Sequence, residues 1–452
     1  MLPAQYRQLH VLVAGSHADD IELGAGGLVQ RLVERGHTVS FLVLTDEHGF
    51  GNVRRAEAGQ AARRLGVPEG NLLFAGFSDG NLRADRQSVG HVRKLLGEAG
   101  IYPEVVVTHS AADSHNDHVQ ANALLRAACR RQVLLFYPIH TSAEPSRFRP
   151  RLFVSLSGCL GEVKMHALDE HRSQLSRLTR CDQAAFEEQL GRLAGLDRAE
   201  AFEIDFQVGT GDALLEVMAL NDSAFHRLWQ PLIRDESLFL LYGIHPQRPR
   251  SGDRCFPHYE NAGRDYLREA FADLWFPRSP LRERPATVED VEPVVEKEHL
   301  VLVGGPLGNP VTRRLINRNP TVDWLVDSDT QHSSGACLVQ RSTGRRIRPK
   351  RDRLGRLVED VGLLTIMPSD SGRGKSVVAC AGGHGVGTQA LLQFLARPQA
   401  NPTLAGRTTG RTAVQVPVRI DIDTFQITPL AQQPQTLSND ARKVRGSYEA
   451  AV

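Results

Sequence analysis

The sequence predicts an α/β protein whose first domain is a Rossmann-like, doubly wound and mostly parallel sheet. Short apolar runs rich in β-branched residues alternate with segments of helical periodicity, and glycines end several of those segments. The 40 glycines and 24 prolines among 452 residues favour many turns over long helices. Strands that alternate with helices in this way form a parallel sheet with helices on both faces.

The predicted elements of the first domain follow one another closely. The run HVLVAG, which ends at Gly15, predicts the first strand. Apolar residues at helical spacing come next, and this pattern stops at Gly36. Further strands are predicted at 40–45, 71–77, 103–109 and 132–138, and further helices at 58–66, 89–100, 119–131 and 164–180.

The length of the chain sets the domain organisation. A chain of 452 residues exceeds what one hydrophobic core usually serves. We expect the first α/β domain to span residues 1–208 and a second, smaller α/β domain to span 298–452. Between them, amphipathic aromatic pieces and polar stretches with proline predict a helical extension and linker at 209–297.

Charge and cysteine content exclude several classes of protein. The net charge is only +2, so no overall field favours nucleic acid or an anionic membrane as partner. The six cysteines contain no CxxC pair, which argues against a zinc ribbon or a disulfide scaffold. The N-terminus has no basic leader before a secretory core, and no run of about eighteen apolar residues occurs. We expect a cytoplasmic protein, and a homo-oligomer stays open.

Two clusters of His and Asp follow predicted strands. SHADD, residues 16–20, follows the first strand, and SHNDH, residues 114–118, follows the strand PEVVVTH. The carboxyl ends of parallel strands share one edge of a sheet, where ligands bind, so adjacent strands would bring the clusters together. A catalytic zinc ion takes three His, Asp or Glu ligands and keeps a fourth position for water. His17, Asp20 and His118 supply such a set.

The spacing within the first cluster assigns a different place to Asp19. The step from His17 to Asp20 can put both donors on one side of a tight turn, with Asp19 turned toward the water. A lone His or Asp in a loop is usually a helix cap or a surface group. Two clusters at matching strand ends nevertheless favour a metal site.

The same motifs resemble those of a known family. SHADDIELGAGG resembles the AHPDDxELGxGG signature of the LmbE-like (PIG-L) deacetylases, and THSAADSHNDHVQAN resembles their second motif. RRAEAGQAARRLGV, GFSDGNL and KMHALDEHRSQ occur in the family's order, so the resemblance covers the predicted first domain. Ser16 and Ala18 stand where the family usually has Ala and Pro.

This resemblance implies zinc-dependent hydrolysis of an N-acetyl group on an N-acetylglucosamine-type sugar or a conjugate of one. It implies that His17, Asp20 and His118 bind zinc. It also implies that Asp19 is the general base and that His115 polarises the carbonyl or stabilises the oxyanion. Acetate and a free amine would be the products. Another amide, or a nucleotide-linked acetamido compound, stays open as the substrate.

Other polar residues have two readings. Asp79 in FSDGNL and Arg54 or Arg55 are candidates to bind substrate hydroxyl groups. Asp-Gly is also a turn signal, and arginine on a helix is usually solvated, so both readings stay open. We expect His171 to support the fold. Glu22 is expected to charge the first turn of its helix.

The second half of the chain contains two glycine-rich turns, LVGGPLGNP and ACAGGHGVGTQ. Such turns let backbone amides approach a phosphate, but tight strand-to-helix turns use the same glycines. An alternative function follows, in which this domain binds a nucleotide-like ligand and regulates the deacetylase. GRGKS is rejected as a phosphate loop because Ser369 replaces the first glycine. The basic run Arg345–Arg356 either touches phosphates or forms a solvated hairpin.

Overall fold

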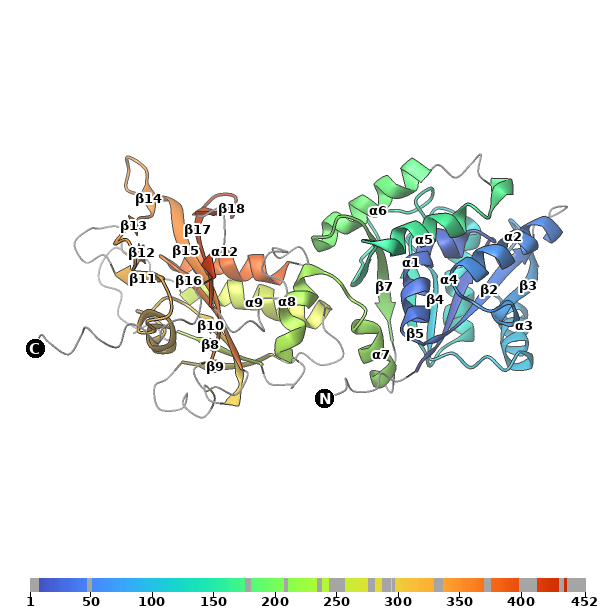
Figure 1. Ribbon diagram of the computed structural model, residues 1–452, viewed down its shortest axis with the longest axis horizontal. Coiled ribbons are helices and arrows are strands. Elements are labelled where there is room, and N and C mark those ends of the chain that lie inside the picture. Colours follow the sequence, from blue (N-terminus) through green and yellow to red (C-terminus); the bar gives the residue numbers. More distant parts are fainter. Residues whose placement is uncertain are drawn as a thin grey trace, which may run out of the picture. The chain divides into compact units, whose positions relative to one another are not determined.

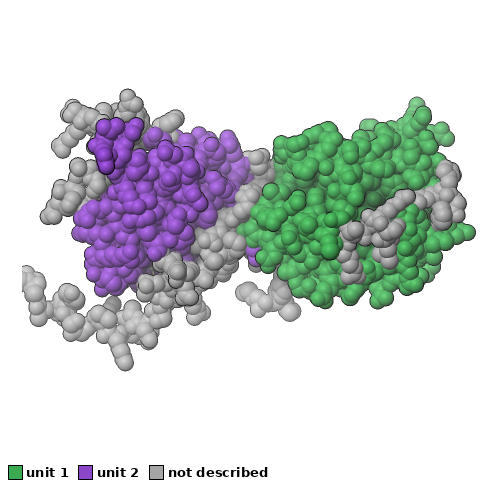
Figure 2. Space-filling model, turned by 90° about the horizontal axis from the view of Figure 1, so that it is seen from above, with its two compact units in different colours: residues 1–224 green, residues 225–452 purple. Residues whose placement is uncertain are grey.

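The protein forms two compact units, residues 1–224 and residues 225–452, each with its own sheet (Figures 1 and 2). None of the described helices is both long and apolar enough to cross a membrane. The computed structural model describes residues 8–46, 51–174, 180–206, 210–233, 238–243, 257–274, 281–286, 294, 297–328, 336–369, 375–397, 413–430 and 435–436.

The first unit is built on a seven-stranded sheet of order β3-β2-β1-β4-β5-β7-β6. Strands β1 to β5 run parallel, and β7 pairs antiparallel with β5 and β6. The predicted mostly parallel sheet is therefore confirmed. The strands are β1 (His10–Gly15), β2 (Thr38–Asp46), β3 (Leu72–Ser78), β4 (Val105–His109), β5 (Val133–Tyr137), β6 (Leu152–Ser155) and β7 (Ala199–Asp205).

Helices pack against this sheet because consecutive strand residues, which point to opposite faces, are apolar and buried. Leu12 and Ala14 of β1 belong to one core with Val92 of α3 and Leu124 of α4. Helix α5 packs against both α1 and α2. The helices are α1 (Asp20–Glu34), α2 (Gly51–Arg64), η1 (Glu69–Asn71), α3 (Arg86–Glu98), α4 (Asn116–Ala128), α5 (Cys159–Leu168), η2 (Arg172–Gln174), α6 (Arg180–Ala194) and α7 (Gly211–Met218).

The prediction of one helix over 164–180 is wrong. Helix α5 ends at Leu168, a single turn of 3-10 helix follows, and α6 begins only at Arg180. Between them His171 is fully buried, and its Nε2 lies 3.1 Å from Oε2 of Glu22 on α1. This contact ties the segment after α5 to α1.

The second unit contains a larger mixed sheet of order β18-β17-β15-β16-β10-β8-β9, to which β14 and β19 are added at the side. Strands β9, β8, β10 and β16 run parallel to one another. Strand β15 pairs antiparallel with both β16 and β17. Strands β11, β12 and β13 form a separate small sheet. The elements are α8 (Ala224–Ile233), β8 (Leu238–Tyr242), α9 (Pro257–Leu274), β9 (Leu281–Pro285), β10 (His299–Val303), α11 (Pro310–Thr312), η3 (Arg313–Asn317), β11 (Trp324–Ser328), β12 (Ala336–Gln340), β13 (Arg346–Ile347), β14 (Lys350–Arg351), β15 (Leu357–Pro368), β16 (Ser376–Gly382), α12 (Gly385–Ala396), β17 (Val414–Asp421), β18 (Ile427–Pro429) and β19 (Gln435–Thr436).

Residues 209–297 do not form only the helical extension and linker that we expected. They contribute α8, β8, α9 and β9 to the second unit, which is no smaller than the first. Strand β8 lies between β9 and β10 at the centre of the parallel part of the sheet. Its sequence LFLLY is a short apolar run, and periodicity cannot distinguish such a run from buried helix.

Candidate metal centre

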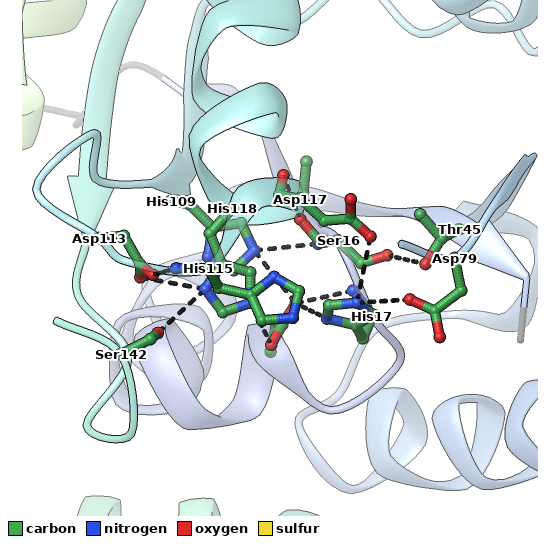
Figure 3. A network of polar contacts seen from close by, with 12 residues as sticks. Ser16, His17, Thr45, Asp79, His109, Asp113, His115, Asp117, His118 and Ser142 are labelled. Atoms are coloured by element: carbon green, nitrogen blue, oxygen red, sulfur yellow. Dashed lines mark hydrogen bonds and ion pairs between the residues drawn. The ribbon is translucent and has the colours of Figure 1, made fainter. Parts of the chain in front are cut away.

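The two His/Asp clusters meet at one edge of the first sheet. The turn after β1 carries His17 and leads into α1 at Asp20, and the loop after β4 leads into α4 at Asn116. Strands β1 and β4 are parallel neighbours, so their carboxyl ends lie side by side. Figure 3 shows the imidazoles and carboxylates from both loops pointing toward one another.

His17, Asp20 and His118 form one compact donor set. Nδ1 of His17 lies 3.2 Å from Oδ2 of Asp20, and Nε2 of His118 lies 3.5 Å from Oδ1 of Asp20. One donor atom from each of the three residues lies within 4.8 Å of the others. Asp20 is the first residue of α1, where the helix dipole favours a carboxylate, and it accepts the backbone N–H of His17 at 2.7 Å.

A carboxylate also faces the second nitrogen of each of these histidines. Nδ1 of His118 lies 3.0 Å from Oδ2 of Asp113. Nε2 of His17 lies 3.1 Å from Oδ1 of Asp79 and 3.7 Å from Oδ2 of Asp117. Metal-binding histidines typically donate their other ring N–H to such a partner, which fixes the tautomer and the ring orientation.

Carboxylates and imidazoles at short range determine the electrostatics of the centre. Burial disfavours charge on both histidines. The charge of Asp20 and the hydrogen bonds that the rings donate to carboxylates outweigh this effect, and they raise the pKa of His17 to about 12 and that of His118 to about 9. Burial likewise opposes ionisation of Asp20, yet the three neighbouring histidines hold its pKa well below the usual range. A divalent cation on the same donors would replace the imidazole protons, because histidine coordinates metals in its neutral form.

The same loops carry polar residues that sequence reasoning missed, foremost His109 at the end of β4. Its imidazole stacks on that of His118, with centroids 4.0 Å apart and planes 9° apart. Its Nε2 lies 2.9 Å from the backbone N of Ser16 and 3.1 Å from Oδ2 of Asp20. Burial lowers the pKa of His109 to about 4, so this ring is a neutral wall of the site. The final His of PEVVVTH, at a strand's carboxyl end, was the available signal.

Asp117 and Asp113 were also absent from the predicted set of site residues. Asp117 accepts the backbone N–H groups of Gly80 and Leu82. Burial raises the pKa of Asp117, but the hydrogen bonds from His17 and from these two N–H groups outweigh it and lower the pKa to about 2. His17 belongs to a second donor set with His115 and Asp117, and His118 belongs to a third with His109 and Asp113. The three sets share His17 or His118, and the membership of each set follows from distances in the folded chain rather than from spacing in the sequence.

Asp19 and His115 stand beside the donor set. Asp19 is the N-cap residue of α1, is partly exposed and makes no side-chain capping hydrogen bond. Burial of the carboxyl group and the charge of Asp20 raise the pKa of Asp19. His115 is exposed, and its ring centroid lies 5.1 Å from that of His17 and 4.5 Å from that of His118. Burial and the charge of His118 lower the pKa of His115.

The predicted substrate residues occupy different positions. Asp79 is in direct contact with His17, so it belongs to the polar network of the centre (Figure 3). Arg54 is buried, whereas Arg55 is exposed and pairs with Asp46 at 2.6 Å. Both arginines line a cavity of about 10 Å³ that includes Ala18. This volume is about that of one water molecule, so the cavity does not itself hold a sugar.

His171 and Glu22 form a buried pair, which agrees with the expected supporting role of His171. Burial opposes the charge on both groups, but Glu22 raises the pKa of His171. Glu22 lies in the first turn of α1, as expected, and in addition it fastens that turn to the segment after α5.

The glycine-rich turn after β16 is filled by the chain itself. A Cβ atom on Gly383 or Gly387 would lie 2.7 Å or 2.3 Å from an oxygen of Asp360, and one on Gly382 would lie 2.3 Å from the backbone N of Thr388. These glycines are therefore explained by close packing rather than by a bound phosphate. GRGKS lies mostly outside the described residues, and β16 begins at its last residue, Ser376.

The first unit is similar in sequence to known proteins. Residues 12–129 match the family described as PIG-L, GlcNAc-PI de-N-acetylase. A relative from Escherichia coli (strain K12), the uncharacterized deacetylase YaiS, is 27% identical over 182 residues, which are 38% of this chain and 96% of YaiS.

Similar solved structures cover the same part of the chain. The conserved protein TT1542 from Thermus thermophilus is 28% identical, with a TM-score of 0.38 over 43% of this chain and 94% of its own. N,N'-diacetylchitobiose deacetylase from Pyrococcus horikoshii is 21% identical, with a TM-score of 0.36 over 43% of this chain and 83% of its own. GalB, the 4-carboxy-2-hydroxymuconate hydratase from Pseudomonas putida, is 20% identical, with a TM-score of 0.38 over 44% of this chain and 97% of its own. The family match itself, over residues 12–129, identifies a PIG-L (LmbE-like) domain there, as the motifs predicted.

Proposed function

Because the first unit carries a PIG-L domain, we propose that this chain is a zinc-dependent N-deacetylase. It removes an acetyl group from a small N-acetylated molecule, an N-acetylglucosamine-type sugar or a conjugate of one, in the cytoplasm. The observation that carries the proposal is the convergence of His17, Asp20 and His118 from two parallel strands onto one point.

The chemistry of the donors fits zinc. Two imidazole nitrogens and one carboxylate are a typical ligand set for a catalytic zinc ion, which keeps one further position open. Each histidine is oriented by a carboxylate on its other nitrogen, Asp113 for His118 and Asp79 with Asp117 for His17. A bound zinc ion supplies Lewis-acid polarisation and a water molecule that ionises near neutral pH.

Asp19 is the proposed general base. It is adjacent to Asp20 and makes no capping hydrogen bond to α1, so its buried carboxyl group is not engaged as a helix cap. Asp19 accepts a proton from the water molecule during attack on the acetamide carbonyl and later gives it to the departing amine. Burial and the charge of Asp20 raise its pKa, which brings its acid form closer to neutral pH and suits the second of these transfers.

His115 is proposed to stabilise the oxyanion. Its lowered pKa keeps the ring neutral near pH 7, and a neutral imidazole still offers one N–H to the carbonyl oxygen. The ring is exposed beside His17 and His118, where the carbonyl would lie. Loss of one such donor typically costs about 2.7–4 kcal/mol of transition-state stabilisation.

Arg54, Arg55 and Asp79 are proposed to contact hydroxyl groups of the substrate. The support is their position, because the arginines line the cavity beside Ala18 and Asp79 contacts His17. Arg55 also pairs with Asp46 at 2.6 Å.

The test combines metal content with acetate release from a panel of N-acetyl sugars. Asp19→Ala should keep its zinc and lose activity by about a hundredfold to ten-thousandfold, the usual contribution of general acid–base help. Asp85→Ala removes a carboxylate that caps α3 instead, and it should keep both zinc and activity. Normal turnover by Asp19→Ala would disprove the base assignment. No acetate from any N-acetyl compound with the zinc-loaded wild type would disprove the function.

A further inference from the structure

The second unit holds a histidine whose orientation is fixed by a buried carboxylate. Asp360 on β15 is 0% exposed, and His384 is the N-cap residue of α12. Oδ1 of Asp360 lies 3.0 Å from Nδ1 of His384, and Oδ2 accepts the backbone N–H of His384 at 3.0 Å. One carboxylate therefore holds both the backbone and the ring of His384.

The surrounding turn is built to enclose this carboxylate. Gly383 and Gly387 have no Cβ, and a Cβ on either would collide with the oxygens of Asp360. The N-terminal end of α12 also stabilises a negative charge at this position. Asp360 therefore occupies the N-terminal end of α12, and the part of His384 left to contact a ligand is its other ring nitrogen, Nε2.

That nitrogen meets an arginine. Because Asp360 accepts the hydrogen on Nδ1, the other ring nitrogen, Nε2, carries the lone pair. Nη2 of Arg351 on β14 lies 3.2 Å from this Nε2, and Nη1 of Arg351 donates to the carbonyl of Gly355 at 3.0 Å. Arg351 is exposed and the side chain of His384 is 26% exposed, so both reach solvent.

The neighbourhood carries an excess of positive charge. The segment Arg345–Arg356, which includes β13 and β14 and leads into the hairpin between β14 and β15, contains seven basic residues and one acidic residue. Acidic partners are Asp327 for Arg346, Glu359 for Lys350, and Asp352 for Arg356. Arg351 has no acidic partner among the described ion pairs and instead faces a neutral ring acceptor.

We propose that Arg351 and His384 bind the phosphate group of a phosphorylated small molecule. The guanidinium carries further N–H groups that match phosphate oxygens, and the hydroxyl of a singly protonated phosphate can replace Nη2 of Arg351 as the donor to Nε2 of His384. The excess basic charge of the segment Arg345–Arg356 favours an anion of more than one charge. The turn after β16 also lies at the carboxyl edge of the parallel strands β10 and β16, where ligands bind in α/β sheets.

The proposal concerns only the second unit and does not depend on the deacetylase activity. It is tested on the full-length protein by calorimetric titration with inorganic phosphate, pyrophosphate and acetate at one ionic strength. Arg351→Gln and His384→Gln should each weaken phosphate binding by about tenfold, or about 1.4 kcal/mol. Arg353→Gln is the matched control, because it removes the same charge from an exposed position of the same hairpin.

Three results would overturn the proposal. An equal loss in Arg353→Gln would mean diffuse attraction by the hairpin. Acetate binding as tight as phosphate would indicate a carboxylate site. No binding by the wild type at millimolar phosphate would mean no site. Phosphate that binds at the metal centre is recognised because His118→Ala removes it and Arg351→Gln does not. If His384→Gln fails to fold, Arg351→Gln on the exposed hairpin carries the test.

Discussion

Oδ2 of Asp113 lies 3.0 Å from Nδ1 of His118, while Nε2 of the same ring faces Asp20 at 3.5 Å. Asp113 is thus a positioning residue for a proposed zinc ligand. Asp113→Asn should weaken zinc binding by about 10–100-fold, the usual effect of losing such a partner. Competition with a zinc-binding dye measures the affinity. Glu144→Gln removes a carboxylate that pairs with Arg147 on the surface and should bind zinc normally. Normal zinc affinity in Asp113→Asn would contradict the assigned role.

Removal of the metal should abolish activity and lower stability. A chelator should stop acetate release, and added zinc should restore it, because the donors are the proposed ligands of the reaction's metal. A ligand that binds only the folded state raises the unfolding temperature, so zinc should stabilise the wild type and not His118→Ala. His91→Ala changes a histidine that instead contacts the carbonyl of Ala75, and it should keep the zinc effect. Full activity in excess chelator would exclude a metal mechanism.

Gly24, in the ELGAGG part of the first motif, is predicted to be irreplaceable for packing. A Cβ atom there would lie 2.0 Å from the ring of Tyr137, whose hydroxyl donates to the carbonyl of Ala14. Gly24→Ala should lower the free energy of unfolding by about 1–3 kcal/mol through overpacking. Gly90→Ala, in the middle of α3 with open space around it, should raise it by about 0.5–1 kcal/mol. Chemical denaturation followed by circular dichroism separates the two; a stabilised Gly24→Ala would refute the packing argument.

Lys164 is predicted to fasten α1 to the rest of the first unit. Its Nζ lies 2.8 Å from the carbonyl of Leu23, from Glu187 and from Glu200, and the lysine is 0% exposed. Lys164→Met removes one partner of a buried ionic cluster, which typically costs about 3–5 kcal/mol.

The matched substitution is Lys94→Met, since Lys94 pairs with Glu98 on the surface of α3. An exposed pair of this kind contributes about 0–1 kcal/mol. Denaturant unfolding of both variants gives the comparison. Equal midpoints would show that the buried cluster does not stabilise the unit.

The stability of the second unit should fall in acid because of His226. Burial lowers the pKa of His226 to about 3 from the ordinary 6.5. Below pH 6.5 the His226 imidazole is protonated in the unfolded chain but stays neutral in the folded unit, so the free energy of unfolding decreases as pH falls toward 3. The slope from this one group approaches about 1.36 kcal/mol per pH unit.

Tryptophan fluorescence can follow this unit selectively, because the three tryptophans, at positions 229, 275 and 324, all belong to it. His226→Gln should flatten the decline of unfolding free energy between pH 6.5 and pH 3 relative to the wild type. The same slope in both proteins would show that another group causes the acid sensitivity.

Local patterns predicted the parallel part of the first sheet well, because each of β1 to β5 is a separate apolar run between turn signals. They failed for β8, where an apolar run follows an amphipathic helix, and for the break after Leu168, beside which His171 contacts Glu22 of α1. They also missed β6 and β7, which pair antiparallel at the end of the sheet. In each case the competing influence came from residues distant in the sequence.

The sequence by itself named the candidate donor residues of the first unit. SHADD and SHNDH named the donor residues, and the strands before them placed both at one sheet edge, because parallel strands end together. Only the tertiary structure decided which carboxylate holds which histidine, that His109 forms a wall of the centre, and that Asp360 fills the glycine-rich turn. The physical reason is that donor identity is local, whereas orientation and burial come from contacts between residues far apart in the chain.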